Sequence, residues 1–140
     1  MTRYLFDSGI VNDYAYRRHG VYERARRTAI AGHQLGIGTP ILGELLGGVR
    51  ASESSERNLR ILERNLSHLK FWPFEESAAR KYGELWAELH ARGRHMQVPN
   101  IQIAAIALML GDCVVVSKDG DLREVPGLTV EDSSRDSGAA

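Results

Sequence analysis

The sequence predicts an α/β fold built on a central, mostly parallel sheet of four to five short strands. The main evidence is the stretch 98–121, in which the most apolar helical segment of the chain is followed by its most apolar strand. Between residues 101 and 110 only Gln102 is polar, so this helix must be buried between other layers. The run at 113–116 is short and rich in β-branched residues, which is typical of a parallel strand covered on both faces.

The remaining elements alternate along the chain in the same way. Short apolar runs predict strands at 3–6, 35–38, 71–72 and 128–131. Amphipathic patterns predict helices at 10–16, 22–33, 54–69 and 75–92, and a further helix that starts with Thr39 as N-cap and Pro40 in its first turn. Strands that alternate with helices pair in parallel. Because no linker divides the chain, we expect one domain over residues 1–132 and a frayed tail over 133–140.

Two helices carry more detailed predictions. Pro99 and Asn100 should begin the buried helix, with Asn100 as its N-cap, and Gly111 should end it. In the helix at 75–92, the 3.6-residue spacing predicts a buried side, which we interpret as core or dimer surface. Its members are Tyr82, Leu85, Trp86 and Leu89.

Charge and composition restrict the possible partners. Lys and Arg number 18 and Asp and Glu 18, so there is no bulk electrostatic attraction to nucleic acid, and any such contact needs a local patch. The most basic stretch includes Arg24, Arg26 and Arg27, which form either a solvated helix face or a contact surface for RNA or a partner. The single Cys113 lies in an apolar strand, there is no membrane-length apolar run, and the first strand begins too early to leave room for a signal peptide. We therefore expect a cytoplasmic protein without a membrane partner.

Polar residues follow the strands at the edge where open α/β sheets bind ligands. Asp7 follows the first strand, Glu44 lies in the helix after the second, and Asp119 follows the strand at 113–116. Asn100, at the start of the buried helix, belongs to the same edge. Three supporting residues lie beside them: Ser8, Ser117 and Asp121. Asp7 alone would be interpreted as a helix cap, but together these residues predict a shared site.

The expected chemistry follows from the oxygen ligands. Carboxylates that lie close together repel one another, and a hard divalent cation relieves the repulsion. A site with oxygen ligands only favours Mg²⁺ or Mn²⁺. Such an ion activates water and stabilises the charge that develops on a phosphodiester. The pattern thus predicts a metal-dependent nuclease. A phosphatase of the haloacid dehalogenase type is disfavoured, because Gly9 stands where its second acid would be.

Five motifs in this order, FDSG, TPILGELLGGV, PNIQIAAIALMLG, VVVSKDGDL and VPGLTVED, resemble the PIN domain, and in particular the VapC-type toxins of bacterial toxin–antitoxin pairs. The resemblance extends to Asp132. It implies a three-layer α/β/α PIN-like fold and a Mg²⁺- or Mn²⁺-dependent endoribonuclease that acts on RNA. It also implies a homodimer held silent by a cognate antitoxin, with DNA contacted only indirectly through that antitoxin.

The acidic positions of the family match Asp7, Glu44 and Asp119, and Ser117 supplies the family's hydroxyl. Asp7, Asn100 and Asp119 would be the metal ligands. Asn100 stands where the family normally has Asp, and Gly9 where it commonly has Asn. An amide oxygen contributes no charge, so we expect weakened or lost activity. Two alternatives stay open: a catalytically silent PIN-fold module that binds RNA or an antitoxin, and an active enzyme in which Asn100 only caps its helix and Asp121 is the third acid.

Overall fold

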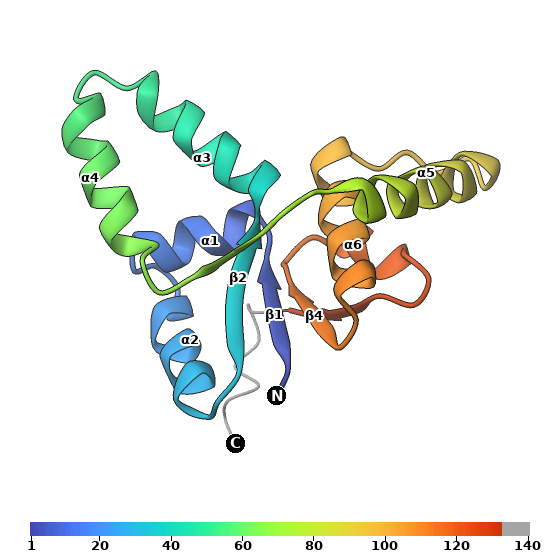
Figure 1. Cartoon of the computed structure of the whole chain (residues 1–140), viewed down its shortest axis with the longest axis horizontal. Helices are drawn as coiled ribbons and strands as arrows, with labels where there is room; N and C mark the ends of the chain where they lie inside the picture. The colour runs from blue at the N-terminus through green and yellow to red at the C-terminus, as the bar shows by residue number, and fades with distance from the viewer. Residues whose placement is uncertain (133–140) are drawn as a thin grey trace.

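The computed structural model of the chain describes residues 1–132, which form a five-stranded sheet with helices packed on both sides (Figure 1). The strand order is β3-β2-β1-β4-β5 and every pairing is parallel. In Figure 1 the strands run through the middle, with α1 and α2 on one side and α5 and α6 on the other. The predicted three-layer α/β/α fold is confirmed. The strands are β1 (Arg3–Phe6), β2 (Gln34–Gly38), β3 (Lys70–Trp72), β4 (Cys113–Val116) and β5 (Thr129–Glu131).

Six α-helices and a 3₁₀-helix connect these strands within the described residues. They are α1 (Ser8–Ala15), α2 (Val21–Ile30), α3 (Thr39–Arg50), α4 (Ser55–Asn65), α5 (Glu76–Ala91), α6 (Val98–Leu110) and η1 (Gly120–Glu124). The predicted tail over 133–140 lies outside the described residues, and the domain boundary at 132 stays a prediction. In the described part of the chain, none of the helices has both the length and the apolar character needed to cross a bilayer.

The buried helix predicted around residues 101–110 is α6, and it lies at the centre of the packing. Its residues from Ile103 to Ala107 are buried without interruption. It lies directly against β2 at Gly38, where an added Cβ would come within 2.6 Å of Ile106 Cδ1. A side chain at position 38 would therefore force the Ile106 side chain to move. Gly111 ends the helix with φ +67°, as the sequence predicted.

The predicted start of α6 is wrong. Gln97, not Asn100, is the N-cap, and the helix begins at Val98. The backbone N–H groups of Asn100 and Ile101 both donate to the carbonyl of Gln97, at 3.0 and 3.2 Å. Pro99 has no N–H to satisfy, so the helix can start one residue before it. Asn100 is consequently a residue of the first helical turn, and its side chain is available for another contact.

Other boundaries differ from the prediction by a few residues. Gly38, not Thr39, is the N-cap of α3, and the Thr39 hydroxyl instead accepts from the backbone N–H of Phe74 at 3.2 Å. The helix predicted over 22–33 ends at Ile30 and the one predicted over 54–69 ends at Asn65, because the chain must turn before it enters β2 and β3. Trp86 was predicted to lie in the core or on a dimer surface; it is not part of the core, because it is 50% exposed in the single chain and stacks on the His90 ring.

A candidate acidic site at the carboxyl edge of the sheet

Asp7 lies where β1 ends and α1 begins. It is the N-cap of α1, and its Oδ1 accepts from the backbone N–H of Ile10 at 2.9 Å. The residue is only 8% exposed. The cap interpretation is thus confirmed, but it uses one carboxylate oxygen and leaves the other for the site.

Ser117 is the buried partner of that second oxygen. β1 and β4 are paired so that Phe6 lies beside Val116, which places the next residues, Asp7 and Ser117, side by side. The Ser117 hydroxyl donates to Oδ2 of Asp7 and accepts from the backbone N–H of Asp119 at 2.9 Å. Ser117 is only 1% exposed, so its hydroxyl is held in place and fixes the carboxylate of Asp7 relative to the backbone of Asp119.

Asp119 continues the chain of hydrogen bonds toward α6. Its Oδ1 accepts from the N–H of Asp121 at 2.9 Å, which caps η1. Its Oδ2 accepts from Nδ2 of Asn100 at 3.0 Å. We call the connected set Asp7, Ser117, Asp119 and Asn100 the acidic chain. It joins the ends of β1 and β4 to the start of α6. Of the four residues predicted to converge, it contains Asp7, Asn100 and Asp119, together with the supporting residue Ser117.

The environment of Asp7 opposes its negative charge. Burial raises the pKa of this carboxyl, and the charges of Asp119 and Asp13 raise it further, whereas the hydrogen bonds from Ser117 and Ile10 lower it; the net direction is upward. A carboxylate that is costly to ionise but hydrogen-bonded on both oxygens can be stabilised by a nearby cation. This property distinguishes a candidate site from an ordinary helix cap.

Glu44 does not join the acidic chain. It is exposed on α3 and lines a hollow of about 490 Å³ with Asn12 and Tyr16 of α1. Within residues 1–132, no three Asp, Glu, His or Cys side chains lie close enough to hold one ion. The expected close convergence of Asp7, Glu44 and Asp119 is therefore not found. The physical reason is the helical rise: Glu44 is five residues beyond Thr39, or about 7.5 Å along α3.

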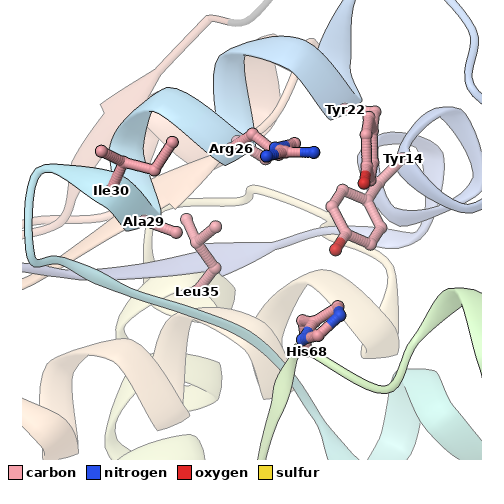
Figure 2. Close-up of a pocket in the computed structure, with 8 residues that line it drawn as sticks. Tyr14, Tyr22, Arg26, Ala29, Ile30, Leu35 and His68 are labelled. Atoms are coloured by element: carbon pink, nitrogen blue, oxygen red, sulfur yellow. The ribbon is translucent and has the colours of Figure 1, made fainter.

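The predicted arginine contacts lie elsewhere. Figure 1 shows α2 beside the early part of β2, away from the edge where β2 enters α3. Arg24 donates to the carbonyl of His19 at 3.0 Å, and Arg27 is exposed. Arg26 extends over a second hollow of about 420 Å³, toward Tyr14 and Tyr22 (Figure 2). A role of these arginines in contacting RNA or a partner stays a prediction, but they do not reach the acidic chain.

The supporting residues differ in their involvement. Ser117 is central to the site. Asp121 contributes its backbone N–H, while its exposed side chain makes no hydrogen bond among the described residues. Ser8 is half-buried as the first residue of α1, and within residues 1–132 its side chain has no hydrogen-bond partner.

Sequence reasoning missed a buried ion pair next to the site. Asp13 of α1 is buried, and its Oδ2 lies 3.3 Å from Nζ of Lys118 and 3.1 Å from Nδ1 of His19. A signal was present: Asp13 lies three residues after Ile10, on the same helix face, which is the buried one. An acid on an apolar helix face calls for a partner.

The side chains of the acidic chain are of the kinds that bind a hard divalent cation. The acidic chain contains two carboxylates and one side-chain amide, each of which can coordinate an ion through an oxygen atom. Two carboxylates balance the charge of one divalent ion, and the unfavourable ionisation of Asp7 is the feature such an ion would relieve. Asn100 directs its nitrogen to Asp119, so its oxygen would face an ion only after the amide turns over.

The fold and the acidic chain define a parallel α/β domain with an acidic site at its carboxyl edge, and comparison with known proteins identifies the family. The profile of the PIN domain matches residues 4–128. The chain therefore belongs to the PIN-domain family, in its VapC-type branch. It is similar to Ribonuclease VapC2 of Haemophilus influenzae, with 29% identity over 131 residues, which is 94% of this chain and 98% of the relative. It is also similar to the tRNA(fMet)-specific endonuclease VapC of Shigella flexneri, with 32% identity over 98 residues, 70% of this chain and 74% of the relative.

Solved structures agree with this assignment. The VapBC2 structure from Rickettsia felis, bound to a promoter DNA fragment, contains a chain with a TM-score of 0.85 and 24% identity, and the match covers 93% of this chain and 98% of that one. The DNA-bound VapBC structure from Salmonella typhimurium gives a TM-score of 0.84 at 26% identity, covering 95% and 99%. The fold thus extends over nearly the full length of these chains.

Proposed function

We propose that this protein is a Mg²⁺- or Mn²⁺-dependent endoribonuclease, the toxin of a toxin–antitoxin pair. Membership of the PIN family and relatives named as ribonucleases support hydrolysis of RNA. The observation that carries the proposal is the acidic chain at the carboxyl edge. In it, the pKa of the buried Asp7 carboxyl is raised, and the Ser117 hydroxyl links Asp7 to the backbone of Asp119.

Each member of the acidic chain would have a separate task. Asp7 and Asp119 would bind the cation, and Asn100 would complete the site with its amide oxygen. When bound, the cation would supply positive charge against the phosphodiester and lower the pKa of water. Ser117 holds Asp7 and Asp119 in a fixed relation. Glu44, outside this chain of hydrogen bonds, would act on the substrate side by orienting RNA or water.

The protein would act with an antitoxin. The similar structures from Rickettsia felis and Salmonella typhimurium are VapBC complexes bound to DNA, so we propose a cognate antitoxin as partner and DNA contact through that antitoxin only. A homodimer, which the resemblance implies, stays a prediction that sedimentation of the purified chain would test.

The test is cleavage of a labelled structured RNA by the purified chain. Cleavage should require Mg²⁺ or Mn²⁺, stop with EDTA and be lost in Asp7→Ala. Glu76→Gln is a matched control, because it removes an exposed carboxylate whose partner among residues 1–132 is Arg80. Cleavage that persists in EDTA or in Asp7→Ala would contradict the proposal and point to a contaminating nuclease or a different site.

A second candidate is a catalytically silent module that binds RNA or the antitoxin. Two observations favour it: Asn100 removes one charge from the site, and Glu44 lies outside the acidic chain. In that case RNA would bind with the same affinity with or without EDTA, and Asp7→Ala would not weaken binding. An Asn100→Asp variant that gains cleavage would show that the fold has kept the site and lost only a ligand charge.

A further inference from the structure

The Asp13–Lys118 ion pair connects α1 to the loop that carries the acidic chain. Lys118 is the residue between Ser117 and Asp119. Its Nζ lies 3.3 Å from Oδ2 of Asp13, whose side chain is 12% exposed. A carboxylate that is this well buried is costly unless it is paired, so the pair is held more firmly than a surface contact.

The loop is therefore attached to α1 at two points. At the start of the helix, Asp7 accepts from the Ser117 hydroxyl. Six residues further along, Asp13 holds the next residue of the loop, Lys118. Asp119 then follows with its N–H bonded back to Ser117. Two attachments on adjacent residues fix the direction of the loop, whereas one would let it pivot.

Asp13 also fixes the turn that follows α1. Its Oδ2 lies 3.1 Å from His19 Nδ1, and its carbonyl accepts from the N–H of Arg18 at 2.8 Å. Arg17 and His19 have φ values of +58° and +56°, a region that residues with a Cβ rarely adopt. The turn thus needs outside contacts to persist, and Asp13 supplies two of them.

We propose that Asp13 is a positioning residue for the acidic site. By holding the Lys118 ammonium, it sets the geometry with which Ser117 and Asp119 meet Asp7, and it keeps that ammonium on α1 instead of beside the carboxylates that would bind the cation. The consequence for catalysis rests on the proposed function. The consequence for loop order does not.

The test uses three single variants, a control variant, one double variant and two readouts. Asp13→Asn and Lys118→Met each remove one charge with little change in size, Lys118→Arg keeps the cation, and Glu76→Gln breaks an exposed helical pair as the control. The first readout is amide hydrogen exchange at Asp119 and Asp121 in metal-free protein. We expect protection to fall on the order of tenfold in Asp13→Asn and in Lys118→Met, and to stay near wild type in Lys118→Arg and the control.

The double variant Asp13→Asn, Lys118→Met completes the design. If the two side chains act as one unit, the double variant loses no more protection than either single variant. The second readout is Mn²⁺ affinity, which should weaken on the order of tenfold in the same variants, as for other residues that orient metal ligands. Unchanged protection at Asp119, or losses that add in the double variant, would overturn the proposal.

The two proposals fail separately. A wild-type chain that neither cleaves RNA nor binds Mn²⁺ would refute the proposed function, while the exchange measurement would still decide the role of Asp13. If Asp13→Asn does not fold, Lys118→Met decides, because the Lys118 side chain is 41% exposed and its removal leaves no cavity in the core.

Discussion

Replacing the buried acid Asp7 by its amide tests whether the ionised carboxylate destabilises the fold when no cation is bound. Asp7→Asn keeps the size of the side chain and the cap on Ile10, and it places an amide nitrogen, which donates, where the Ser117 hydroxyl donated to Oδ2. Asn is as good an N-cap as Asp. The charge is lost, and the hydrogen bond with Ser117 is kept with its direction reversed. Asp7→Ala loses the charge together with the cap and the partner of Ser117, so the two variants separate charge from structure.

The sign of the effect follows from the raised pKa of Asp7. The folded protein holds the proton of this carboxyl more tightly than the unfolded chain does, so stability falls as the pH rises through that interval and the full penalty is present near neutral pH. Asp7→Asn escapes the penalty. We expect it to unfold at a higher temperature than wild type near neutral pH, and the difference should narrow toward about pH 4 and close below it, once the carboxyl is protonated in both states.

The structural cost in Asp7→Ala can be estimated separately. A lost N-cap costs about 1 kcal/mol, and a buried hydroxyl without its acceptor costs about 1 kcal/mol more. For a chain of this length, about 1 kcal/mol shifts the melting temperature by roughly 3 °C. Asp7→Ala should therefore melt roughly 6 °C below Asp7→Asn at every pH.

The assay is thermal unfolding followed by circular dichroism in excess EDTA, near neutral pH and near pH 4. Glu76→Gln, which removes a charge at an exposed pair, should melt like wild type at both. Two results would contradict the prediction: Asp7→Asn that is no more stable than wild type near neutral pH, or a stability advantage that persists in acid. Either would mean that the ionised carboxylate does not destabilise the fold, and the argument for a cation site would lose its electrostatic basis.

Three further predictions concern the rest of the acidic chain. Mn²⁺ at about a hundred times its dissociation constant should stabilise wild type by about 2.7 kcal/mol and leave Asp7→Asn unchanged in melting temperature; equal shifts in both would place the ion elsewhere. Asn100→Asp replaces the 3.0 Å contact to Asp119 by a like-charge pair, costing about 1 kcal/mol without metal, and should bind Mn²⁺ more tightly and cleave RNA faster; equal cleavage rates would remove the explanation based on Asn100. Ser117→Ala should lower the melting temperature by roughly 3–6 °C and reduce cleavage, whereas Ser67→Ala, whose exposed hydroxyl bonds only a backbone carbonyl, should do neither.

The sequence predicted the parallel sheet and the buried helix because both leave strong local patterns. The apolar run in α6 and the β-branched run in β4 permit few other placements, and Gly111 marks a boundary that requires positive φ. Boundaries that depend on tertiary contacts were less accurate. Asn100 lost the cap position because the helix could begin before Pro99, and Trp86 stayed exposed because no element packs over that part of α5 within the described residues.

The site was predicted in part for the same reason. Strand ends leave local signals, and the carboxyl ends of parallel strands meet at one edge of the sheet, so the sequence placed Asp7, Ser117 and Asp119 at the same edge. The distance of Glu44 from them depends on the helical rise over the five residues from Thr39, which the prediction did not take into account, and on the tilt of α3, which residue order does not specify. The Asp13–Lys118 pair links positions 105 residues apart in sequence, and no spacing rule reaches that far.

The close packing of α6 against Gly38 means that the residue at position 100 can change its charge while the helix that carries it keeps its position. The Ile106 side chain fills the space beside Gly38, and residues 103–107 are buried without interruption, so packing holds the helix that carries position 100 against the sheet. An acid or an amide at that point would occupy the same location and differ in charge alone. A single substitution at position 100 could therefore raise or lower the affinity of this edge for a cation during evolution without changing the fold.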